Sequence, residues 1–212
     1  MQNTSHAVMA QRIEPNDSPD DFPTPPWATR ALLEYIIGEH NIAAQTCLEP
    51  ACGAGHMVMA LQEYFSNVEY ADAYDYGFGP VSEFLSYPYK VDSVDWVITN
   101  PPFRLAEEFV LKALTIAKYG VAILARTVFL ESSGRFNRIF KEQPPTKFAQ
   151  FVERVPMIRG RLDIKATTAT GYAWLVWEKG STGYPRLMWV PPCRKQLERR
   201  SDYPPATGQR KM

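Results

Sequence analysis

A strand that runs into a glycine turn and then a helix constrains the fold of this chain most strongly. The run TCLE at 46–49 is typical of a short strand, PACGAG at 50–55 of a tight turn, and apolar residues over 57–64 recur at helical spacing. Strand, glycine turn and helix in this order open a βαβ unit. Gly53 and Gly55 allow the backbone to bend and to approach a ligand closely, next to the free N–H groups of a helix start. Glycine turns are common in α/β proteins, so the flanking strand and helix carry the interpretation.

The rest of the first two thirds continues this alternation. Thr24 suits an N-cap, Pro25 a first helical residue and Gly38 a C-cap, which predicts a helix over 25–37. The further expected elements are strands at 68–71 and 94–99, a short third strand or its exit at 83–85, a helix over 105–118 that Gly120 ends, and a strand at 121–124. Alternating strands and helices predict an α/β fold with a doubly wound, mostly parallel sheet.

After Arg126 the chain changes character. The expected elements there are a basic helix over 132–140, strands at 148–155, 171–177 and 187–190, and a polar loop at 157–170. A seven-stranded sheet with an antiparallel C-terminal strand completes the predicted fold. We expect a flexible arm at 1–21, one domain at 22–190, and a Pro-rich, disordered tail at 191–212.

Composition excludes several classes of protein. A hydrophobic fraction of 45% and a charged fraction of 22% are ordinary for a soluble globular domain, and no apolar run approaches the roughly 20 residues that span a bilayer. The N-terminus lacks the pattern of a secretion signal. The three cysteines have no CxxC spacing, and Cys52 with His56 makes a poor metal site. We therefore expect a reduced, cytoplasmic protein, bacterial or in a phage-infected cell, with no membrane and no metal partner.

Charge is distributed unevenly along the chain. Residues 1–100 hold 3 Lys/Arg against 14 Asp/Glu, whereas residues 101–212 hold 20 against 9. A basic second half favours an anionic partner such as nucleic acid, although the two halves could instead neutralise each other across an interface. The candidate contacts to a nucleic-acid backbone are Arg126, Arg135, Arg138, Arg159, Arg161 and Lys165.

A second abrupt turn, NPPF at 100–103, follows the strand at 94–99. The two prolines fix two φ angles, remove two backbone donors and push Asn100 out of helical geometry. The turn then exposes an amide, free carbonyls and the ring of Phe103, which can bind a planar amine and stack on its ring. A plain strand-to-helix turn would contain the same residue types. In open α/β sheets, ligands bind at the edge to which this turn belongs.

Two acidic residues follow the glycine turn at informative positions. Asp72 ends the second strand, 17 positions after Gly55, where an acid can accept hydrogen bonds from a ribose diol. Asp75 competes for this role, and a capping or solvated aspartate is the structural alternative. Glu83 could reach the adenine amine of a cofactor.

The order of TPPW at 24–27, EPACGAG at 49–55, Asp72, Glu83 and NPPF at 100–103 resembles the S-adenosylmethionine-dependent amino-methyltransferases. Within these, the chain is most similar to the small, phage-borne, adenine-specific DNA methyltransferases. The resemblance covers residues 22–178 and implies the Rossmann-like fold of class I methyltransferases. It also implies S-adenosylmethionine as cofactor and DNA as the partner, with oligomeric state left undefined.

The resemblance implies a role for each motif residue. The implied cofactor contacts are Thr24, Glu49, Ala51, Gly53, Gly55, Asp72 and Glu83. Asn100 and the carbonyl of Pro101 would accept hydrogens from the target amine, Pro102 would complete the turn, and Phe103 would stack on the flipped base. Transfer would then be a direct in-line displacement in which the enzyme supplies positioning and electrostatics.

The sequence departs from the family in two places. It has no room for a separate target-recognition domain, and Glu83 stands where Asp is more usual, whereas Phe103 in place of Tyr keeps the stacking face. RNA bases and the side-chain amide of a protein glutamine are alternative substrates because enzymes for both use such a turn. A non-catalytic, nucleic-acid-binding module with the same fold is the alternative of another class.

Overall fold

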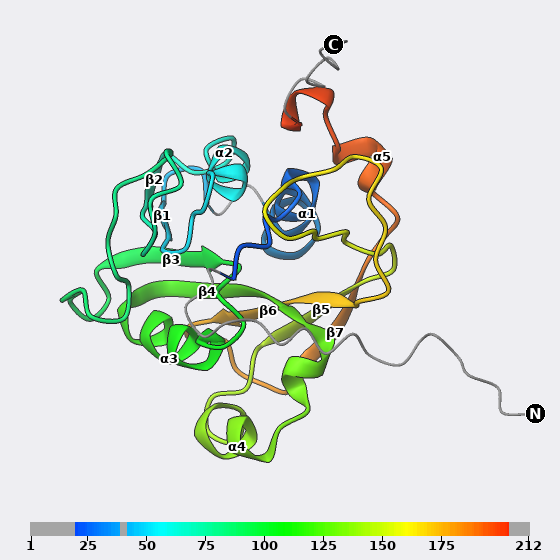
Figure 1. Ribbon diagram of the computed structural model, residues 1–212. Helices are drawn as coiled ribbons and strands as arrows, with labels where there is room; N and C mark the ends of the chain where they lie inside the picture. Colours follow the sequence, from blue (N-terminus) through cyan, green and yellow to red (C-terminus); the bar gives the residue numbers. More distant parts are fainter. Residues whose placement is uncertain (1–19, 39–41, 204–212) are drawn as a thin grey trace, which may run out of the picture.

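The computed structural model describes residues 20–38 and 42–203, which build a seven-stranded sheet between two layers of helices (Figure 1). The strands are β1 (Thr46–Glu49), β2 (Asn67–Tyr70), β3 (Val94–Thr99), β4 (Ala117–Arg126), β5 (Lys147–Phe151), β6 (Tyr172–Glu178) and β7 (Arg186–Val190). Their order in the sheet is β2-β1-β3-β4-β6-β5-β7. β6 runs antiparallel to β4 and β5, and the other neighbouring strands are parallel. The predicted fold class is therefore confirmed, with β6 rather than the last strand as the antiparallel one.

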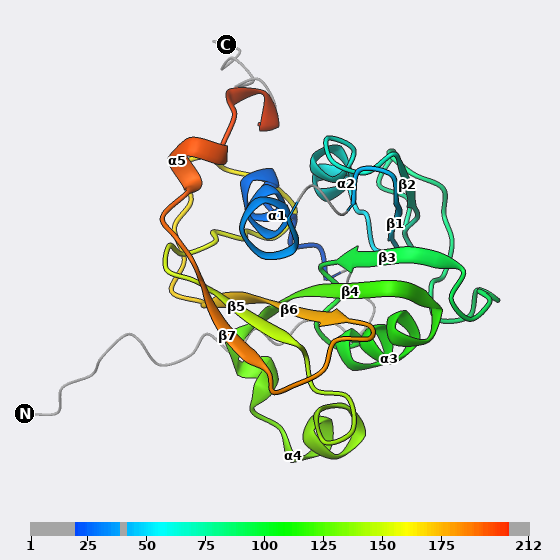
Figure 2. The same ribbon diagram turned by 180° about the vertical axis from the view of Figure 1, so that it is seen from behind.

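Helices cover both faces of the sheet, which can be seen from the front and from the back (Figures 1 and 2). One layer holds α1 (Pro26–Leu32), its continuation η1 (Leu33–Ile37), α2 (His56–Leu61), α5 (Arg194–Leu197) and η5 (Arg200–Asp202). The other holds α3 (Ala106–Ile116), η3 (Thr127–Leu130), α4 (Ser133–Arg135) and its continuation η4 (Phe136–Phe140). Within the described residues, none of these helices has the length and apolar character that crossing a bilayer requires.

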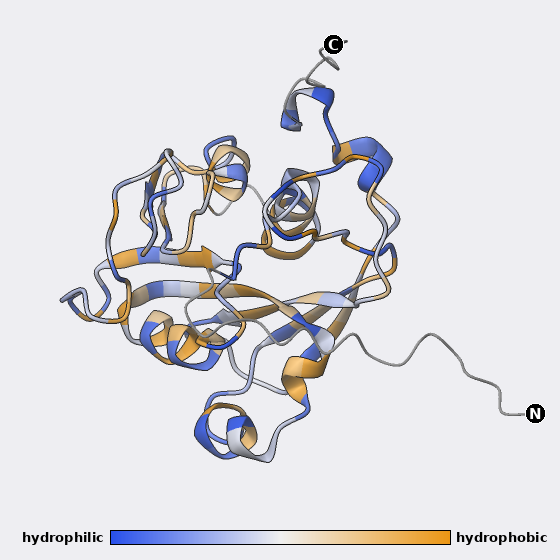
Figure 3. Ribbon diagram, viewed as in Figure 1, coloured by the Kyte–Doolittle hydropathy of each residue, from blue (hydrophilic) through white to orange (hydrophobic). Residues whose placement is uncertain are grey.

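The central strands are mostly apolar because helices bury them on both sides. Figure 3 shows apolar residues gathered in these strands and polar residues on the outer sides of the helices. On one face Trp27 of α1 is fully buried, and the indole of Trp174 donates a hydrogen bond to the carbonyl oxygen of Ala28 at 3.0 Å. On the other face Phe109 and Val110 of α3 are buried. This double layer makes β1, β3 and β4 a rigid base for the loops that follow them.

Two predictions for the stretch from β2 to β4 need correction. Residues 83–85 do not form a third strand: 84–86 form a turn, and an isolated bridge pairs Val81 with Asp72 just after β2. Gly120 does not end a helix but lies inside β4, opposite Trp96. A Cβ atom at Gly120 would come within 2.3 Å of the Trp96 ring, so close packing and not chain reversal explains this glycine.

The two ends of the domain also differ from the prediction. Pro25, not Thr24, is the N-cap of α1, which begins at Pro26. The predicted disordered tail is wrong for residues 191–203, which form α5 and η5 against α1. The nine residues after them, 204–212, and the predicted arm before Asp20 lie outside the described residues.

A buried ion cluster, here called the clasp, holds this C-terminal segment in place. Arg30 of α1 is 3% exposed and contacts Glu63 and Asp202, each at 2.8 Å. The same guanidinium donates a hydrogen bond to the carbonyl oxygen of Leu197 at 2.7 Å. The two carboxylates compensate for the burial of the cation, and the pKa of Asp202 is lowered by Arg30 although burial opposes this.

The topology brings the two predicted turns together. β1 pairs in parallel with β3, in the register Cys47 to Trp96 and Leu48 to Val97. Parallel neighbours lie about 4.8 Å apart and end at the same edge of a sheet. The glycine turn after β1 and the NPPF turn after β3 therefore leave the sheet side by side, at the point where strand order reverses.

Candidate active site

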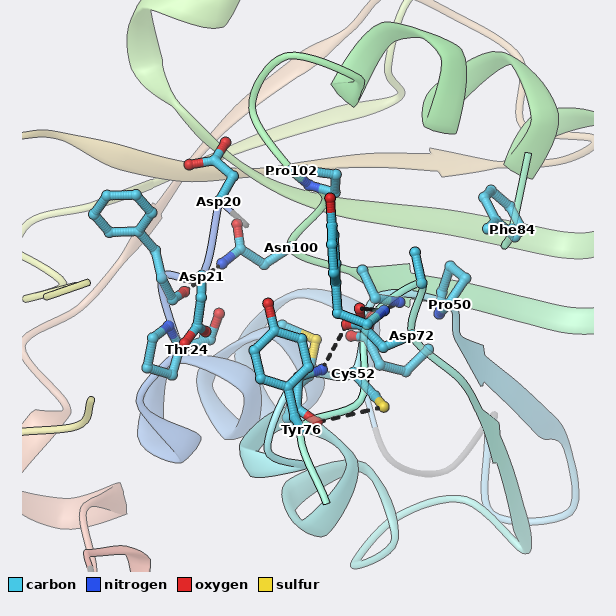
Figure 4. A pocket seen from close by; sticks show the side chains of 18 of the residues that line it. Asp20, Asp21, Thr24, Pro50, Cys52, Asp72, Tyr76, Phe84, Asn100 and Pro102 are labelled. Carbon is cyan, nitrogen blue, oxygen red and sulfur yellow. Dashed lines mark hydrogen bonds between the residues drawn. The ribbon is translucent and has the colours of Figure 1, made fainter. Parts of the chain in front are cut away.

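A cavity of about 280 Å³ lies at the carboxyl ends of β1, β2 and β3. Its wall comes from residues 20–24, which we call the strap, from residues 49–54, 72–74 and 76, and from the turn after β3, with further side chains from neighbouring segments. Figure 4 shows side chains of these segments converging on one space. Small-molecule sites in proteins typically measure roughly 300–1,000 Å³, so the cavity can hold part or all of a small ligand.

Asn100 places an acceptor without a partner at the wall of this cavity. Its Nδ2 donates a hydrogen bond to the carbonyl oxygen of Phe22 at 2.9 Å and lies 3.6 Å from the sulfur of Met157. The reverse orientation would set two oxygens against each other, so these contacts define which end of the amide is Oδ1. Oδ1 is buried and has no hydrogen-bond partner among residues 20–38 and 42–203. An unpaired buried acceptor costs about 1–3 kcal/mol, which a ligand that donates a hydrogen bond would offset.

The strap also encloses the ring of Phe103. The ring centroid of Phe22 lies 5.3 Å from that of Phe103, and Asp20 Oδ2 accepts a hydrogen bond from the Phe103 N–H at 2.6 Å. From the end of β4, the guanidinium of Arg126 lies 4.0 Å from the Phe103 centroid. These neighbours separate Phe103 from the cavity, whose lining residues do not include it.

Glu49, the last residue of β1, is a carboxyl group with 1% exposure. Its Oε1 accepts hydrogen bonds from the Thr99 hydroxyl at 2.5 Å and from the Ala51 N–H at 2.9 Å. Burial raises the pKa of Glu49 to about 8 in spite of these two bonds, and the nearby Asp72 adds to the rise. A cation beside this group would favour its ionised form.

Asp72 and Asp21 approach the glycine turn from two sides. Asp72 accepts hydrogen bonds from the Gly53 N–H at 2.9 Å and from the Tyr74 N–H at 3.0 Å. Asp21 Oδ1 lies 3.9 Å from the place that a Cβ at Gly53 would occupy. Burial raises the pKa of both carboxyl groups, Asp72 raises that of Asp21 further, and Arg159 lowers it. Carboxyl groups that crowd one cavity in this way match a positively charged ligand.

The two glycines of the turn have different neighbours. Gly53 has a φ of +51° and Gly55 a φ of +83°, a region that favours glycine. At Gly55 a Cβ would come within 2.3 Å of the ring of Phe78, so the loop after β2 packs directly on this residue. At Gly53 the nearest atom is that of Asp21, which leaves this part of the backbone open to the cavity.

The structure brings most of the predicted cofactor and catalytic residues into this wall. Those that line the cavity are Thr24, Glu49, Ala51, Gly53, Asp72, Glu83, Asn100 and Pro102. Gly55, Pro101 and Phe103 belong to the same turns but do not line it. Asp75, the competitor of Asp72, is also outside and binds the Gly77 N–H at 2.8 Å.

The residues of the wall that sequence reasoning missed include Asp20, Asp21, Phe22 and Tyr76. Asp20 and Asp21 were assigned to the flexible arm on composition alone. Their position in the sequence could have predicted their place in the wall. They directly precede the Pro-rich entry to α1, and a helix that packs on the sheet brings its entry segment to the sheet edge. The tyrosine stands in a loop that the sequence identified only as aromatic and glycine-rich.

Three of the predicted nucleic-acid contacts lie on or beyond β4. Arg126 stacks on the turn as described above. Arg135 donates a hydrogen bond to the carbonyl oxygen of Phe129 at 2.6 Å, and exposed Arg138 bonds to Glu107 at 2.7 Å. Glu107 belongs to the first turn of α3, which directly follows the NPPF turn, so this group lies beside the cavity on the α3 side of the sheet.

The other three, Arg159, Arg161 and Lys165, are exposed on the 157–170 loop. This loop runs beside α1, on the opposite face of the sheet from α3 (Figures 1 and 2). The Gly160 N–H donates a hydrogen bond to the carbonyl oxygen of Asp21 at 2.9 Å, which ties the loop to the strap. Basic side chains therefore stand on both sides of the cavity.

Comparisons with known proteins agree on the architecture. No protein-family model matches this sequence, and no curated protein matches it significantly. Among solved structures, a Listeria monocytogenes protein assigned as a class I S-adenosylmethionine-dependent methyltransferase is similar (TM-score 0.58, 13% identity) over 82% of this chain and 67% of its own. A protein assigned as the modification subunit of a type I restriction enzyme from Vibrio vulnificus is similar too (TM-score 0.60, 14% identity) over 87% of this chain and half of its own.

A third similar structure is a Pyrococcus horikoshii protein assigned as an RNA methyltransferase (TM-score 0.55, 17% identity), matched over 74% of this chain and 87% of its own. At these identities the likeness establishes the fold. The chain has the Rossmann-like fold of the class I methyltransferases, with a mixed sheet of seven strands.

Proposed function

We propose that this protein is an S-adenosylmethionine-dependent methyltransferase that acts on the exocyclic amine of adenine in DNA. The observation that carries the proposal is the buried Oδ1 of Asn100, which has no partner within the described part of the chain and belongs to a residue of a cavity wall crowded with carboxyl groups. The acceptor suits an N–H of a target amine, and the carboxyl groups suit a cationic methyl donor. The likeness in fold to methyltransferases supports the same conclusion.

The residues of the cavity fit S-adenosylmethionine, which when bound supplies a methyl group on a positively charged sulfur. Glu49 would hold the ammonium group and Asp72 the ribose hydroxyls, while Glu83 would accept from the adenine amine. Gly53 would pass under the methionine part, where its backbone is open to the cavity. Thr24 is buried at the start of the helix entry and would close over the carboxylate.

The contribution of the chain to the transfer is to orient the target amine. The lone pair of an exocyclic amine is delocalised into its ring, which makes the amine a poor nucleophile. Asn100 Oδ1 and the Pro101 carbonyl would accept its two hydrogens out of the ring plane and so localise the lone pair. Held in this way, the amine needs no protein nucleophile, and it passes one proton to solvent as it gains the methyl group.

The aromatic surroundings of Asn100 support a base rather than an amide side chain as the target. Phe22 and Phe103 face each other at the turn, and a flipped base is commonly held by such rings. Their centroids are 5.3 Å apart, whereas a base stacked between two rings needs about 7 Å, so Phe22 must move when a base enters. The basic residues on both sides of the cavity would contact the nucleic-acid backbone.

The test is a methyl-transfer assay with labelled S-adenosylmethionine and, in parallel, duplex DNA, RNA and a protein extract. We expect label in N6-methyladenine of DNA. Label found only in RNA or only in protein would show that this other molecule, and not DNA, is the substrate. Donor binding without transfer to any of them would leave a non-catalytic module.

Asn100→Ala should abolish transfer and leave the affinity for the donor nearly unchanged. Asn67→Ala, at an exposed position of β2, is the matched control and should retain full activity. Unchanged turnover in Asn100→Ala would show that the NPPF turn is only structural.

A further inference from the structure

Asp21 occupies a defined position between the strap and the glycine turn. Its carbonyl oxygen accepts the hydrogen bond from Gly160 at 2.9 Å, which fixes the main chain. Its carboxylate oxygens lie 3.9 Å and 4.0 Å from the places that a Cβ would take at Gly53 and at Gly160. Figure 4 shows Asp21 on one side of the cavity and Asp72 on the other. The strap thus holds a negative charge over the cavity, close to the turn that would carry a methyl donor.

Several acidic groups lie near Asp21 in the cavity wall, which also contains Arg104. Burial is the largest cause of the raised pKa of Asp21, and the charge of Asp72 is the second. Burial also raises the pKa of the Tyr76 hydroxyl most, and the charge of Asp21 raises it further. Asp20, its neighbour on the strap, acts on Tyr76 in the same direction. Arg159, on the 157–170 loop, lowers the pKa of Asp21. A strap closed in this way sets like charges together, and a positive charge between them would stabilise it.

We propose that Asp21 makes the cavity selective for the charge of its occupant, so that S-adenosylmethionine is held more tightly than S-adenosylhomocysteine. This inference rests on the proposed function. In the transfer the sulfur–methyl bond breaks and its electron pair stays on sulfur, a carbon–nitrogen bond forms, and the amine proton passes to solvent. The sulfur loses its positive charge, and Asp21 loses the partner that offset the repulsion from Asp72. The strap then opens and the product leaves.

The experiment compares the dissociation constants of the two compounds by calorimetry in the wild type, Asp21→Asn and Asp75→Asn. Asp21→Asn removes the charge and keeps the shape and the main-chain contact. Asp75→Asn makes the same change at an exposed position outside the cavity wall. We expect Asp21→Asn to weaken the donor about tenfold and the product less than twofold, with both constants unchanged in Asp75→Asn. An analogue with a protonated amine in place of the sulfonium should behave as the donor does.

Equal weakening of both compounds by Asp21→Asn, or no weakening of either, would overturn the inference while leaving the proposed function intact. A wild type that binds neither compound would instead refute the proposed function. Hydrogen exchange of residues 20–24 gives a readout without substitution. The strap amides of the wild type should be more protected with the donor than with the product, and equal protection would count against the inference. Asp21→Ser, a second neutral variant, replaces Asp21→Asn if that protein does not fold.

Discussion

Replacing Glu49 by glutamine should remove a strong pH dependence from the stability of the fold. The amide keeps an oxygen for the Thr99 hydroxyl and the Ala51 N–H but cannot ionise. In the wild type the folded-state pKa of about 8 lies above the ordinary value of 4.5, because burial disfavours the carboxylate. The folded protein therefore retains a proton that the unfolded chain has released. The contribution of this proton to stability is present at low pH and is lost as pH rises from about 5 to 8.

The slope in this window is about 1.4 kcal/mol per pH unit. Between pH 5.5 and pH 7.5 the unfolding free energy of the wild type should fall by about 2.5 kcal/mol relative to Glu49→Gln. Urea unfolding of both proteins from pH 5 to pH 9 measures this difference, in which the effects of other titrating groups cancel. Above pH 8 the difference should become constant. Plots of unfolding free energy against pH that run parallel for the two proteins would refute the reasoning. A rise in the stability of the wild type relative to Glu49→Gln with increasing pH would refute it too.

Two further substitutions test the packing around the site. Gly55→Ala should lower the unfolding free energy by about 3 kcal/mol, because it strains the backbone and clashes with the Phe78 ring. Gly180 has a φ of +81° and no described neighbour within 4 Å, so Gly180→Ala should lower it by only about 1 kcal/mol, from backbone strain alone. Equal urea midpoints for the two variants would contradict the close packing at Gly55. Arg30→Met removes the buried cation of the clasp, which leaves Asp202 without its ion pair to Arg30 while Glu63 keeps Arg199 at 2.9 Å, and should lower the unfolding free energy by about 3 kcal/mol. Limited proteolysis should then cut within 191–203, and an intact C-terminal segment would show that the clasp does not hold it.

The central strands could be predicted from sequence because their signal is local. The runs at 46–49 and 94–99 match β1 and β3 residue for residue, since a strand buried on both faces reads as a short apolar run with a turn at its end. From two such strands, the common edge for the NPPF and glycine turns follows from the geometry of parallel sheets. The residues of the cavity wall that lie in these two turns could therefore be predicted from the sequence alone.

The errors come from contacts between residues that are distant in sequence. Gly120 was interpreted as a helix end because glycine commonly ends helices, but here it makes room for Trp96 on the neighbouring strand. The segment 191–203 looks disordered by composition, but its ion pair with Arg30, its hydrogen bonds to Glu153 and the burial of Leu197 in the core make it part of the domain. Asp21 was placed in a flexible arm for the same reason. Local propensity contains no information on such partners, so these positions could not be predicted without the fold.

The contacts of the strap determine how a base can enter the site. The carbonyl of Phe22 binds Asn100, and the carbonyl of Asp21 binds Gly160, so the main chain is held at two consecutive residues. Movement of the whole strap would break both bonds and release the amide that must grip the amine. Rotation of the Phe22 side chain would break neither, and it would free the face of Phe103 that the ring covers. In the proposed reaction, entry of the base therefore requires only the side chain of Phe22 to turn, while opening of the strap as a whole belongs to product release.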